Sequence, residues 1–438
     1  MRPTIPQSPS ADVASRPTNN PGLRPRDAQH PDTGDKTTSE PSREELFEQC
    51  KHLALAPSIL DGFGAELRRC GTVGKLDNFH ILFLAMNTRF SQQPASAVLK
   101  GDATAGKSFT LNTVLNYFPA EAYESMSGMS EKALMYWDRD LRNKMLCIGE
   151  LAGLQSENGN PWLRQLLTEN KIDYAVTIEE KGGGRATRNL VVEGPTGLLM
   201  TTTAAKLHAE DETRMLSLYV DDGPEHTAAV LRAQAMKAAG IERPQPDVTA
   251  WQALHRWIDA GPKAVLAPFF EDLSANVDPT NGRMKRDFPK VLEFVKAHAL
   301  LHQATRERDP AGRIVATLDD YAAVHDLMAG LLAEGQADTL DAGVNEVVAA
   351  VSVLSAAGPY RSGVPQTAIV EYLGGDETPA RINKSTVSRR VKKALQQGYL
   401  TTEPSRPGTG SQLKVGRKRG RVRPILPTPS DLARMSST

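Results

Sequence analysis

The chain reads Ala97-Val98-Leu99-Lys100-Gly101-Asp102-Ala103-Thr104-Ala105-Gly106-Lys107-Ser108 at the point that decides its fold. Residues 101–108 fit the pattern G-x-x-x-x-G-K-[ST] without a mismatch. The apolar run before the motif predicts a buried strand, and the residues from Phe109 to Leu115 begin a helix. A strand, a glycine-rich loop and a helix N-terminus together form an anion site, because backbone N–H groups and the positive end of the helix dipole converge there. We therefore predict a nucleotide-binding P-loop.

Each residue of this loop has an expected role in binding ATP and Mg²⁺. Lys107 would reach the β- and γ-phosphates, and the hydroxyl of Ser108 would bind Mg²⁺. The alternative is a chance match in a loop rich in glycine and alanine. The remaining predicted contacts to the nucleotide are Gly101, Asp102, Ala103, Thr104, Ala105 and Gly106.

Length and composition limit what kind of protein this can be. With 438 residues the chain can hold two or three domains, and its 52 basic and 52 acidic residues balance, so no global charge draws it to nucleic acid or membrane. Cys50, Cys70 and Cys147 match no zinc or disulfide spacing, which suits a reducing cytoplasm. The sequence has neither a bilayer-spanning apolar stretch nor the layout of a signal peptide. We expect a cytoplasmic protein with no membrane partner.

The beginning of the chain differs in composition from the rest. Residues 1–43 contain eight prolines and no aromatic residue. Such a segment buries too little apolar surface to offset its ordering entropy, so it is predicted to be a disordered arm. An apolar pattern begins near Glu44, and residues 76–86 predict a buried helix that leads into the P-loop strand. The predicted ATPase core covers residues 44–223.

A second apolar strand, 144–150, ends in a carboxylate. A strand of this kind downstream of a P-loop is where an acid polarises the attacking water, which makes Glu150 the candidate catalytic base. The preceding position, where a carboxylate on the metal side is usual, is Gly149. Mg²⁺ would then depend on Ser108, water and phosphate. The alternative is an ordinary strand end.

Three further features follow within the core. Alternating segments at 172–178 and 187–192 predict a β-hairpin with a glycine tip; it carries Lys181, Arg185 and Arg188, unless these belong to a solvated loop. The strand at 197–203 ends in hydroxyls that can bond a γ-phosphate or its water, with Thr202 or Thr203 as the candidate. Arg214 precedes another buried strand and is either part of a structural ion pair or an arginine finger for a neighbouring subunit.

The second half of the chain predicts a helical lid at 224–340 and a winged helix at 341–423. The expected helices are 344–357, 365–373 and 384–399, with a wing at 400–415. Between Arg381 and Arg423 there are thirteen basic residues and one acid, Glu403, which favours contact with the DNA backbone over a protein-docking role. Residues 424–438 are expected to be a flexible tail. The candidate DNA contacts are Lys384, Arg389, Arg390, Lys393 and Arg417.

The order of these elements resembles an AAA+ ATPase of the minichromosome-maintenance (MCM-like) type, close to helicase-like ATPases encoded with primases in phages and other mobile elements. Residues 101–108 match its Walker A motif, and Cys147-Ile148-Gly149-Glu150 occupies the place of its Cys-Ile-Asp-Glu element. By position, the hairpin resembles the pore hairpin, Thr202 or Thr203 the sensor-1 residue, Arg214 the arginine finger and Arg286 the sensor-2 arginine.

The resemblance implies a hexameric ring with nucleotide between subunits. Lys107, Ser108 and Glu150 would come from one subunit and Arg214 from its neighbour, while Lys181 and Arg185 would follow single-stranded DNA in the pore. The implied function is an ATP-driven DNA helicase or translocase that replicates a mobile genetic element, with any primase supplied separately. Two alternatives stay open: an ATP-switched replication initiator or helicase loader, and a non-enzymatic DNA-binding regulator with a vestigial nucleotide site.

Overall fold

The structure is a computed structural model of the chain. Everything below concerns the residues that it describes. These are 41–130, 132–151, 160–179, 185–204, 207–241, 243–277, 283–337, 342–356, 360, 363–373, 384–396, 398–403, 412–416 and 425–435.

A five-stranded sheet with the strand order β2-β3-β6-β1-β7 forms the centre of the fold. All neighbouring strands in it are parallel. Parallel sheets are covered on both faces, and β1 shows this, because every one of its residues is buried. The strands are β1 (Ser96–Lys100), β2 (Tyr123–Met129), β3 (Lys144–Leu151), β6 (Thr196–Thr202) and β7 (Met215–Tyr219).

Side chains of β1 alternate between two apolar cores. Ala97 and Leu99 belong to a large core that includes residues of the helices around the P-loop, and Val98 belongs to a smaller core on the opposite face. The P-loop follows β1 directly, as the sequence predicts, and leads into α4 (Lys107–Asn116). This mixed α/β fold with a parallel central sheet fits the expected P-loop AAA+ core.

Helices from both halves of the chain share the large core. Phe63 of α2 stacks on Phe83 of α3 with ring centroids 4.3 Å apart, and Trp251 of α8 meets Phe83 edge-on at 5.8 Å. The region expected to be a lid is therefore packed into one core with the first helices of the chain. The helices are α1 (Arg43–Ala54), α2 (Ile59–Arg69), α3 (Asp77–Asn87), α7 (Pro224–Ala238), α8 (Val248–Asp259), α9 (Phe270–Ala275), α10 (Met284–Leu301) and α11 (Leu318–Ala337).

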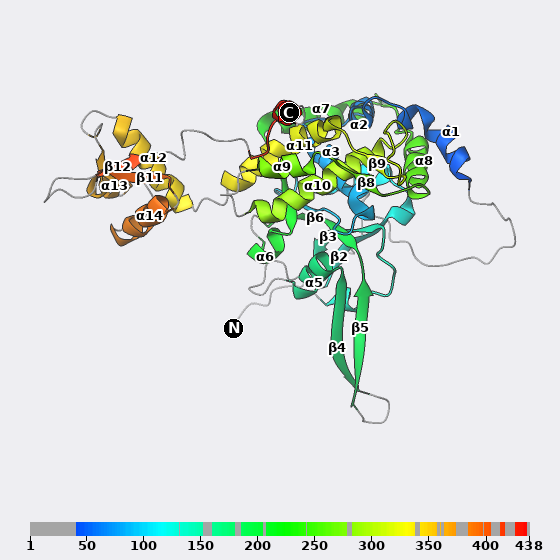
Figure 1. The fold of residues 1–438 in the computed structure, drawn as a ribbon, viewed down its shortest axis with the longest axis horizontal. Coiled ribbons are helices and arrows are strands. Elements are labelled where there is room, and N and C mark those ends of the chain that lie inside the picture. Colours follow the sequence, from blue (N-terminus) through cyan, green and yellow to red (C-terminus); the bar gives the residue numbers. More distant parts are fainter. Residues whose placement is uncertain are drawn as a thin grey trace, which may run out of the picture. The chain divides into compact units, whose positions relative to one another are not determined.

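The predicted hairpin is present as the antiparallel pair β4 (Lys171–Glu179) and β5 (Arg185–Glu193), drawn in Figure 1 as one long two-stranded ribbon. It directly follows α5 (Pro161–Glu169), whose Leu163 and Leu166 are buried in the smaller core together with Ile172 and Val192. The tip, with Lys181, lies outside the described residues.

Residues 342–416 contain the three predicted helices, and they contain strands within the range predicted for the wing. A separate apolar core joins the three helices and a three-stranded sheet of order β10-β12-β11. The first helix begins two residues earlier than expected and the third ends before Tyr399. The elements are α12 (Ala342–Ala356), β10 (Val364–Pro365), α13 (Gln366–Leu373), α14 (Lys384–Gln396), β11 (Leu400–Glu403) and β12 (Gln412–Val415).

One prediction about order is wrong. The end of the chain is not a tail: α15 (Pro429–Met435) packs on α9 and α11, with Leu426 and Leu432 fully buried in the large core. Tyr321 of α11 also donates a 2.6 Å hydrogen bond to the carbonyl of Pro427. The short apolar pattern of residues 425–435 hid this, because only Leu426 and Leu432 are fully buried in the core and Ile425 packs against it in part. The parts of the chain on both sides of 342–416, α11 and residues 425–435, therefore pack in the large core.

The sequence also gave no sign of β2. This strand lies at the edge of the sheet and exposes much of its length, so its residues are largely polar and lack the apolar run by which the other strands are found. None of the helices in the described residues is long and apolar enough to cross a membrane.

Candidate functional site: a P-loop and a distant arginine cluster

The P-loop has the backbone shape that binding a phosphate requires. Gly101 has φ +148° and Gly106 has φ +87°, both in the region that side chains disfavour. A Cβ on Gly101 would lie 3.3 Å from that of Ala105, so the loop is closed tightly around the position. Gly106 is the N-cap of α4 and leaves the first N–H groups of the helix without a side-chain cap among the described residues. These donors can bind a triphosphate.

Lys107 and Ser108 are suited to the roles predicted for them. The Lys107 ammonium is almost fully buried and donates to the carbonyls of Gly101 (2.9 Å) and Asp102 (2.5 Å). Burial lowers the pKa of Lys107 and the nearby Asp102 opposes that shift. An ammonium has three donors, so one remains for a phosphate oxygen. Ser108 is exposed in the first turn of α4, where its hydroxyl is accessible to a metal ion. The residues present fit ATP and Mg²⁺.

Glu150 lies at the same end of the sheet as the P-loop. Ile148 is in register with Met200 of β6, and Met200 is in register with Val98 of β1. Two residues further along, Glu150 is therefore level with Lys100, the last residue before the P-loop, and two strand spacings (about 10 Å) away across the sheet. The Glu150 side chain is exposed. This position suits a base that acts on water at a bound γ-phosphate.

The absence of an acid at position 149 has a steric reason. A Cβ placed on Gly149 would overlap the carbonyl oxygen of Ser127 in β2, and it would lie 3.1 Å from the carbonyl carbon. Backbone cannot move away as a flexible side chain can, so this approach of β2 requires glycine. Among the described residues, no group of three or more His, Cys, Asp or Glu side chains could hold a metal ion. Ser108 supplies a hydroxyl that could bind a metal beside a nucleotide.

Of the three threonines at the end of β6, two form hydrogen bonds within the protein and one is exposed. Thr201 donates a 2.7 Å hydrogen bond to the carbonyl of Gly149, and Thr202 accepts one of 3.1 Å from the Ala204 N–H. Thr203 follows the strand and is exposed. Both Thr202 and Thr203 lie at the P-loop end of the sheet, because Thr202 is in register with Lys100.

Arg214 and Arg286 lie together, away from the P-loop of the same chain. Arg214 immediately precedes Met215, which is in register with Ser96 at the start of β1, whereas the P-loop follows Lys100. The two ends of this strand pair are about 13 Å apart along the chain direction. Arg286 donates to the hydroxyl of Thr213, the residue next to Arg214. The expected sensor-2 arginine is therefore a neighbour of the expected finger, and the sequence alone did not bring the two together.

Neutral acceptors hold the Arg214 guanidinium. Its Nε donates to the Thr168 hydroxyl at 2.9 Å and its Nη1 to the Glu210 carbonyl, and it forms no ion pair with a carboxylate of the described residues. Burial lowers the pKa of Arg214, and the charge of Arg286 lowers it further. Within the described part of the chain, Arg214 is therefore not in the structural ion pair that was one of its two predicted roles. We define the arginine cluster as Arg164, Arg214, Arg283, Arg286 and Lys290, with the acids Glu210, Asp211 and Asp287.

The cations expected on the hairpin are described only in part. Arg188 is exposed and is in register with Val176 of β4. Arg185 begins β5 opposite Glu179, but its side chain lies outside the description, as does Lys181 altogether.

One of the predicted DNA contacts on α14, Arg390, lies toward α12, and its contact with DNA stays a prediction. Arg390 forms a 2.6 Å ion pair with Glu346 of α12 and fills the space beside Gly343, where a Cβ would be 2.5 Å from its Cζ. Helical periodicity turns this residue toward α12, which a count of basic residues does not reveal. Arg417 lies outside the described residues. The exposed stripe of α14 consists of Lys384, Ser385, Ser388, Arg389, Lys392, Lys393 and Gln396.

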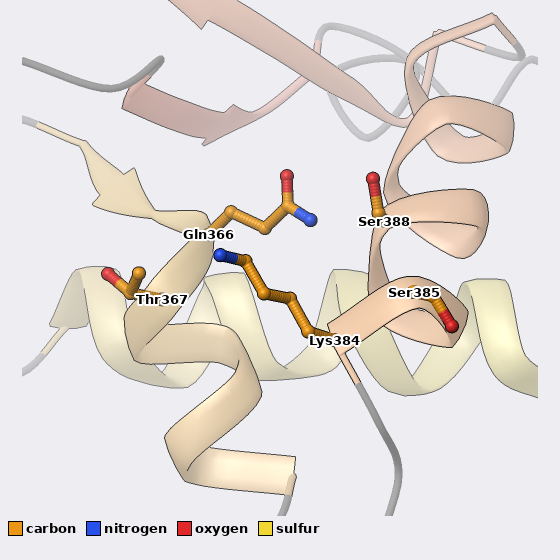
Figure 2. A pocket seen from close by; sticks show the side chains of 5 residues that line it. All are labelled: Gln366, Thr367, Lys384, Ser385 and Ser388. Atoms are coloured by element: carbon orange, nitrogen blue, oxygen red, sulfur yellow. The ribbon is translucent and has the colours of Figure 1, made fainter.

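A cavity of about 520 Å³ opens beside this stripe. It is lined by Gln366 and Thr367 at the start of α13 and by Lys384, Ser385 and Ser388 of α14. Figure 2 shows the Lys384 side chain extending toward Gln366 across the space between the two helices. The cavity lies far along the sequence from the P-loop and shares no residue with it.

Comparisons with known proteins give no family assignment. No protein-family model matches the chain, and no curated protein matches it. Among solved structures it is similar to a full-length MCM homolog from Methanopyrus kandleri, with a TM-score of 0.42, 12% identity and coverage of 66% of this chain and 61% of that one. This chain thus spans about three fifths of the length of that protein.

Two other solved structures are similar at 12% identity. The Aeropyrum pernix ORC1 protein in complex with DNA has a TM-score of 0.23, with 88% of this chain and 98% of that chain covered. The C-terminal region of NrS-1, in an apo form, has a TM-score of 0.30, with 84% of this chain and 75% of that chain covered.

Proposed function

We propose that the chain is an ATP-hydrolysing AAA+ motor that moves along or unwinds DNA as a hexameric ring. Lys107, Ser108 and Glu150 would bind and hydrolyse ATP with Mg²⁺, and Arg214 of the next copy would complete the site. By resemblance, the process would be replication of a mobile genetic element with a separate primase. The observation that carries the proposal is the separation of the arginine cluster from the P-loop of its own chain.

This separation has a direct consequence for assembly. An arginine about 13 Å from the P-loop along the strands is badly placed for the γ-phosphate bound by the same copy. It can serve a nucleotide only across a contact in which one face of a copy meets a different face of the next. Such head-to-tail contacts generate a closed ring when the rotation between successive copies closes.

The charge of the arginine cluster also supports a triphosphate as its partner. Among the described residues, its five cations face three acids. One of these is Asp211, whose pKa is raised by burial. Two guanidinium groups side by side, Arg214 and Arg286, repel each other unless an anion lies between them. A neighbour's γ-phosphate would supply that anion.

Mixing two inactive variants tests the shared site. Lys107→Ala and Arg214→Ala should each lower kcat for ATP by about 100-fold or more. In a 1:1 mixture, about a quarter of random head-to-tail contacts pair an intact Lys107 with an intact Arg214, so ATPase activity should return. Lys51→Ala, an exposed lysine on α1, is the control. A mixture as inactive as its components would refute a site shared between copies.

Substitutions in the hairpin distinguish a DNA motor from an ATP-switched initiator. Replacing Lys181, Arg185 and Arg188 together by alanine should leave basal ATPase activity within about twofold of wild type. Strand displacement on forked DNA should be abolished, because these cations would hold the DNA phosphate backbone. Unchanged strand displacement would exclude the pore role and favour the initiator.

The second candidate function is an ATP-switched replication initiator or loader that recognises duplex DNA. The exposed stripe of α14, which carries four cations and two serines, favours it. In this case residues 341–423 would act as a winged helix with α14 on the DNA. The test replaces 342–416 by a short Gly/Ser linker and keeps α15, because truncation at 342 would also expose the core at Leu426 and Leu432. DNA affinity and its salt dependence should fall; an unchanged salt slope would refute this role.

A further inference from the structure

α5 and the base of the hairpin form one packed unit. Trp162 meets Tyr174 of β4 edge-on, with ring centroids 4.3 Å apart. Asn170, the C-cap of α5, leads straight into β4, and its carbonyl accepts a 2.7 Å hydrogen bond from the N–H of Gly194 just after β5. Together with the buried leucines of α5, these contacts fix the helix to both strands. A shift of α5 therefore carries the hairpin with it.

The opposite side of α5 contacts the residues around Arg214. Asn160, Arg164 and Thr168 follow one another at intervals of four and so lie on one face of the helix. The Asn160 N–H donates to Asp211 at 2.9 Å, and Arg164 pairs with Glu210 and Asp211. At the end of this row, the Thr168 hydroxyl accepts from Nε of Arg214.

Thr168 is chemically suited to hold an arginine finger. A carboxylate at this place would orient the guanidinium but would also neutralise its charge. A hydroxyl fixes the orientation and leaves the full positive charge for a phosphate. The nearby carboxylates of Glu210 and Asp211 are engaged by Arg164. Nothing in the sequence around Thr168 singles it out, since it is one exposed threonine near the end of a helix.

We infer that Thr168 is a positioning residue that ties the Arg214 finger to α5, so that contact of the finger with a neighbour's nucleotide shifts the β4–β5 hairpin. The inference rests on the proposed function. It assigns the direct side-chain contact between the finger and α5, and through it a link between ATP on one copy and DNA on the next, to the Thr168 hydrogen bond. The path runs from Arg214 through Thr168 and α5 to Trp162 and Tyr174.

The test compares Thr168→Val, which removes the acceptor at nearly constant shape, with Thr168→Ser, which keeps it. In the full-length protein, the valine variant should lower kcat for ATP about tenfold, with KM within about twofold, because the finger acts mainly in the transition state. The serine variant should stay near wild type. Thr227→Val, an exposed threonine on α7, is the matched control.

Hydrogen exchange supplies the readout that a purely structural role would not change. Adding a non-hydrolysable ATP analogue should alter amide protection in 171–179 and 185–193 of wild type and Thr168→Ser, and leave it unaltered in Thr168→Val. If Arg214→Ala is inactive while Thr168→Val matches wild type in both readouts, the inference is overturned and the proposed function stands. If Arg214→Ala keeps full ATPase activity, the proposed function itself fails.

Discussion

The two ends of the β1–β7 strand pair differ in how they are built. At one end the P-loop arises from a single local stretch, in which two glycines, a lysine and a helix start occupy consecutive positions. At the other end the arginine cluster draws side chains from α5, α6 (Ala209–Glu212), the start of β7 and α10, more than 120 residues apart in the chain. A site built from consecutive residues can be recognised in the sequence. A site built from residues that are distant in the chain can be recognised only in the folded structure.

The difference extends to how each end holds its cations. Lys107 caps carbonyls of its own loop, and it would do so in any chain that forms this turn. Arg214 donates a hydrogen bond to Thr168, and Arg286 donates one to Thr213. Each arginine is thus held by a residue that is distant from it in the chain. The P-loop should therefore bind nucleotide in an isolated copy, while the arginine cluster should matter only in an assembly.

The largest expected effect separates binding from hydrolysis. At protein concentrations too low for assembly, Lys107→Ala should weaken binding of a fluorescent ATP analogue by about 100-fold, because it removes the ammonium from the phosphates. Arg214→Ala and Arg286→Ala should leave this affinity within about twofold of wild type. Fluorescence titration of the three variants against wild type measures it. Weakened binding in Arg286→Ala would mean that this arginine reaches the nucleotide of its own copy, and the contrast between the two ends would disappear.

The next largest effect concerns Gly149, where β2 approaches the strand that carries Glu150. Gly149→Asp, which introduces the usual acid, should lower the free energy of unfolding by about 2–4 kcal/mol, because the new side chain must displace the backbone at Ser127. Urea denaturation measures the change. The control is Gly330→Ala in α11, where nothing lies within 4 Å of an added Cβ and the helix should gain slightly. A stable and more active Gly149→Asp would show that β2 yields there.

The same contrast explains what the sequence could predict. The P-loop carries a residue motif, the buried strands are apolar runs, and the hairpin and the helices of residues 342–416 carry periodic apolar patterns. These elements are confirmed. The edge strand β2 and the returning helix α15 carry too few apolar residues for such a pattern, and both escaped prediction.

Side-chain partners were harder to predict than elements. The sequence marked Arg214 and Arg286 as separate candidates, but neither Thr168 nor Thr213 shows any local sign of its role. It also grouped Arg390 with Arg389, because charge alone does not tell which side of a helix faces its neighbour. Tertiary contacts decide such questions, and they depend on residues that are distant in the chain.

Acid should destabilise the fold through a buried histidine at the C-terminus of α10. His302 is the C-cap of this helix and accepts a 3.5 Å hydrogen bond from the Ile59 N–H. Burial, together with the charges of His298 and Arg306, lowers the pKa of His302 to about 3. The unfolded chain binds this proton below about pH 6.5, so the stability due to neutral His302 is complete above that pH and is lost as pH falls toward 3.

Wild type should therefore lose about 2 kcal/mol of unfolding free energy from this residue between pH 7.5 and pH 5. His302→Gln, which stays neutral and can still accept from Ile59, should lose correspondingly less over the same range. Urea denaturation at the two pH values gives the comparison. Equal losses in both proteins would show that His302 titrates normally in the folded state.

The smallest effect concerns two neighbouring arginines of α14, of which one is exposed and the other forms an ion pair. Arg389 is exposed on the stripe of α14, whereas Arg390 is paired with Glu346. Arg389→Ala should weaken DNA binding and reduce the slope of log affinity against log salt by about one, as expected for one lost phosphate contact. Arg390→Ala should leave the slope unchanged and cost at most about 1 kcal/mol of stability, because the ion pair is partly exposed. A reduced slope in Arg390→Ala would mean that Glu346 releases this arginine to DNA. The principle drawn from Arg214, that an arginine serves an outside anion only if a carboxylate does not already hold it, would then fail here.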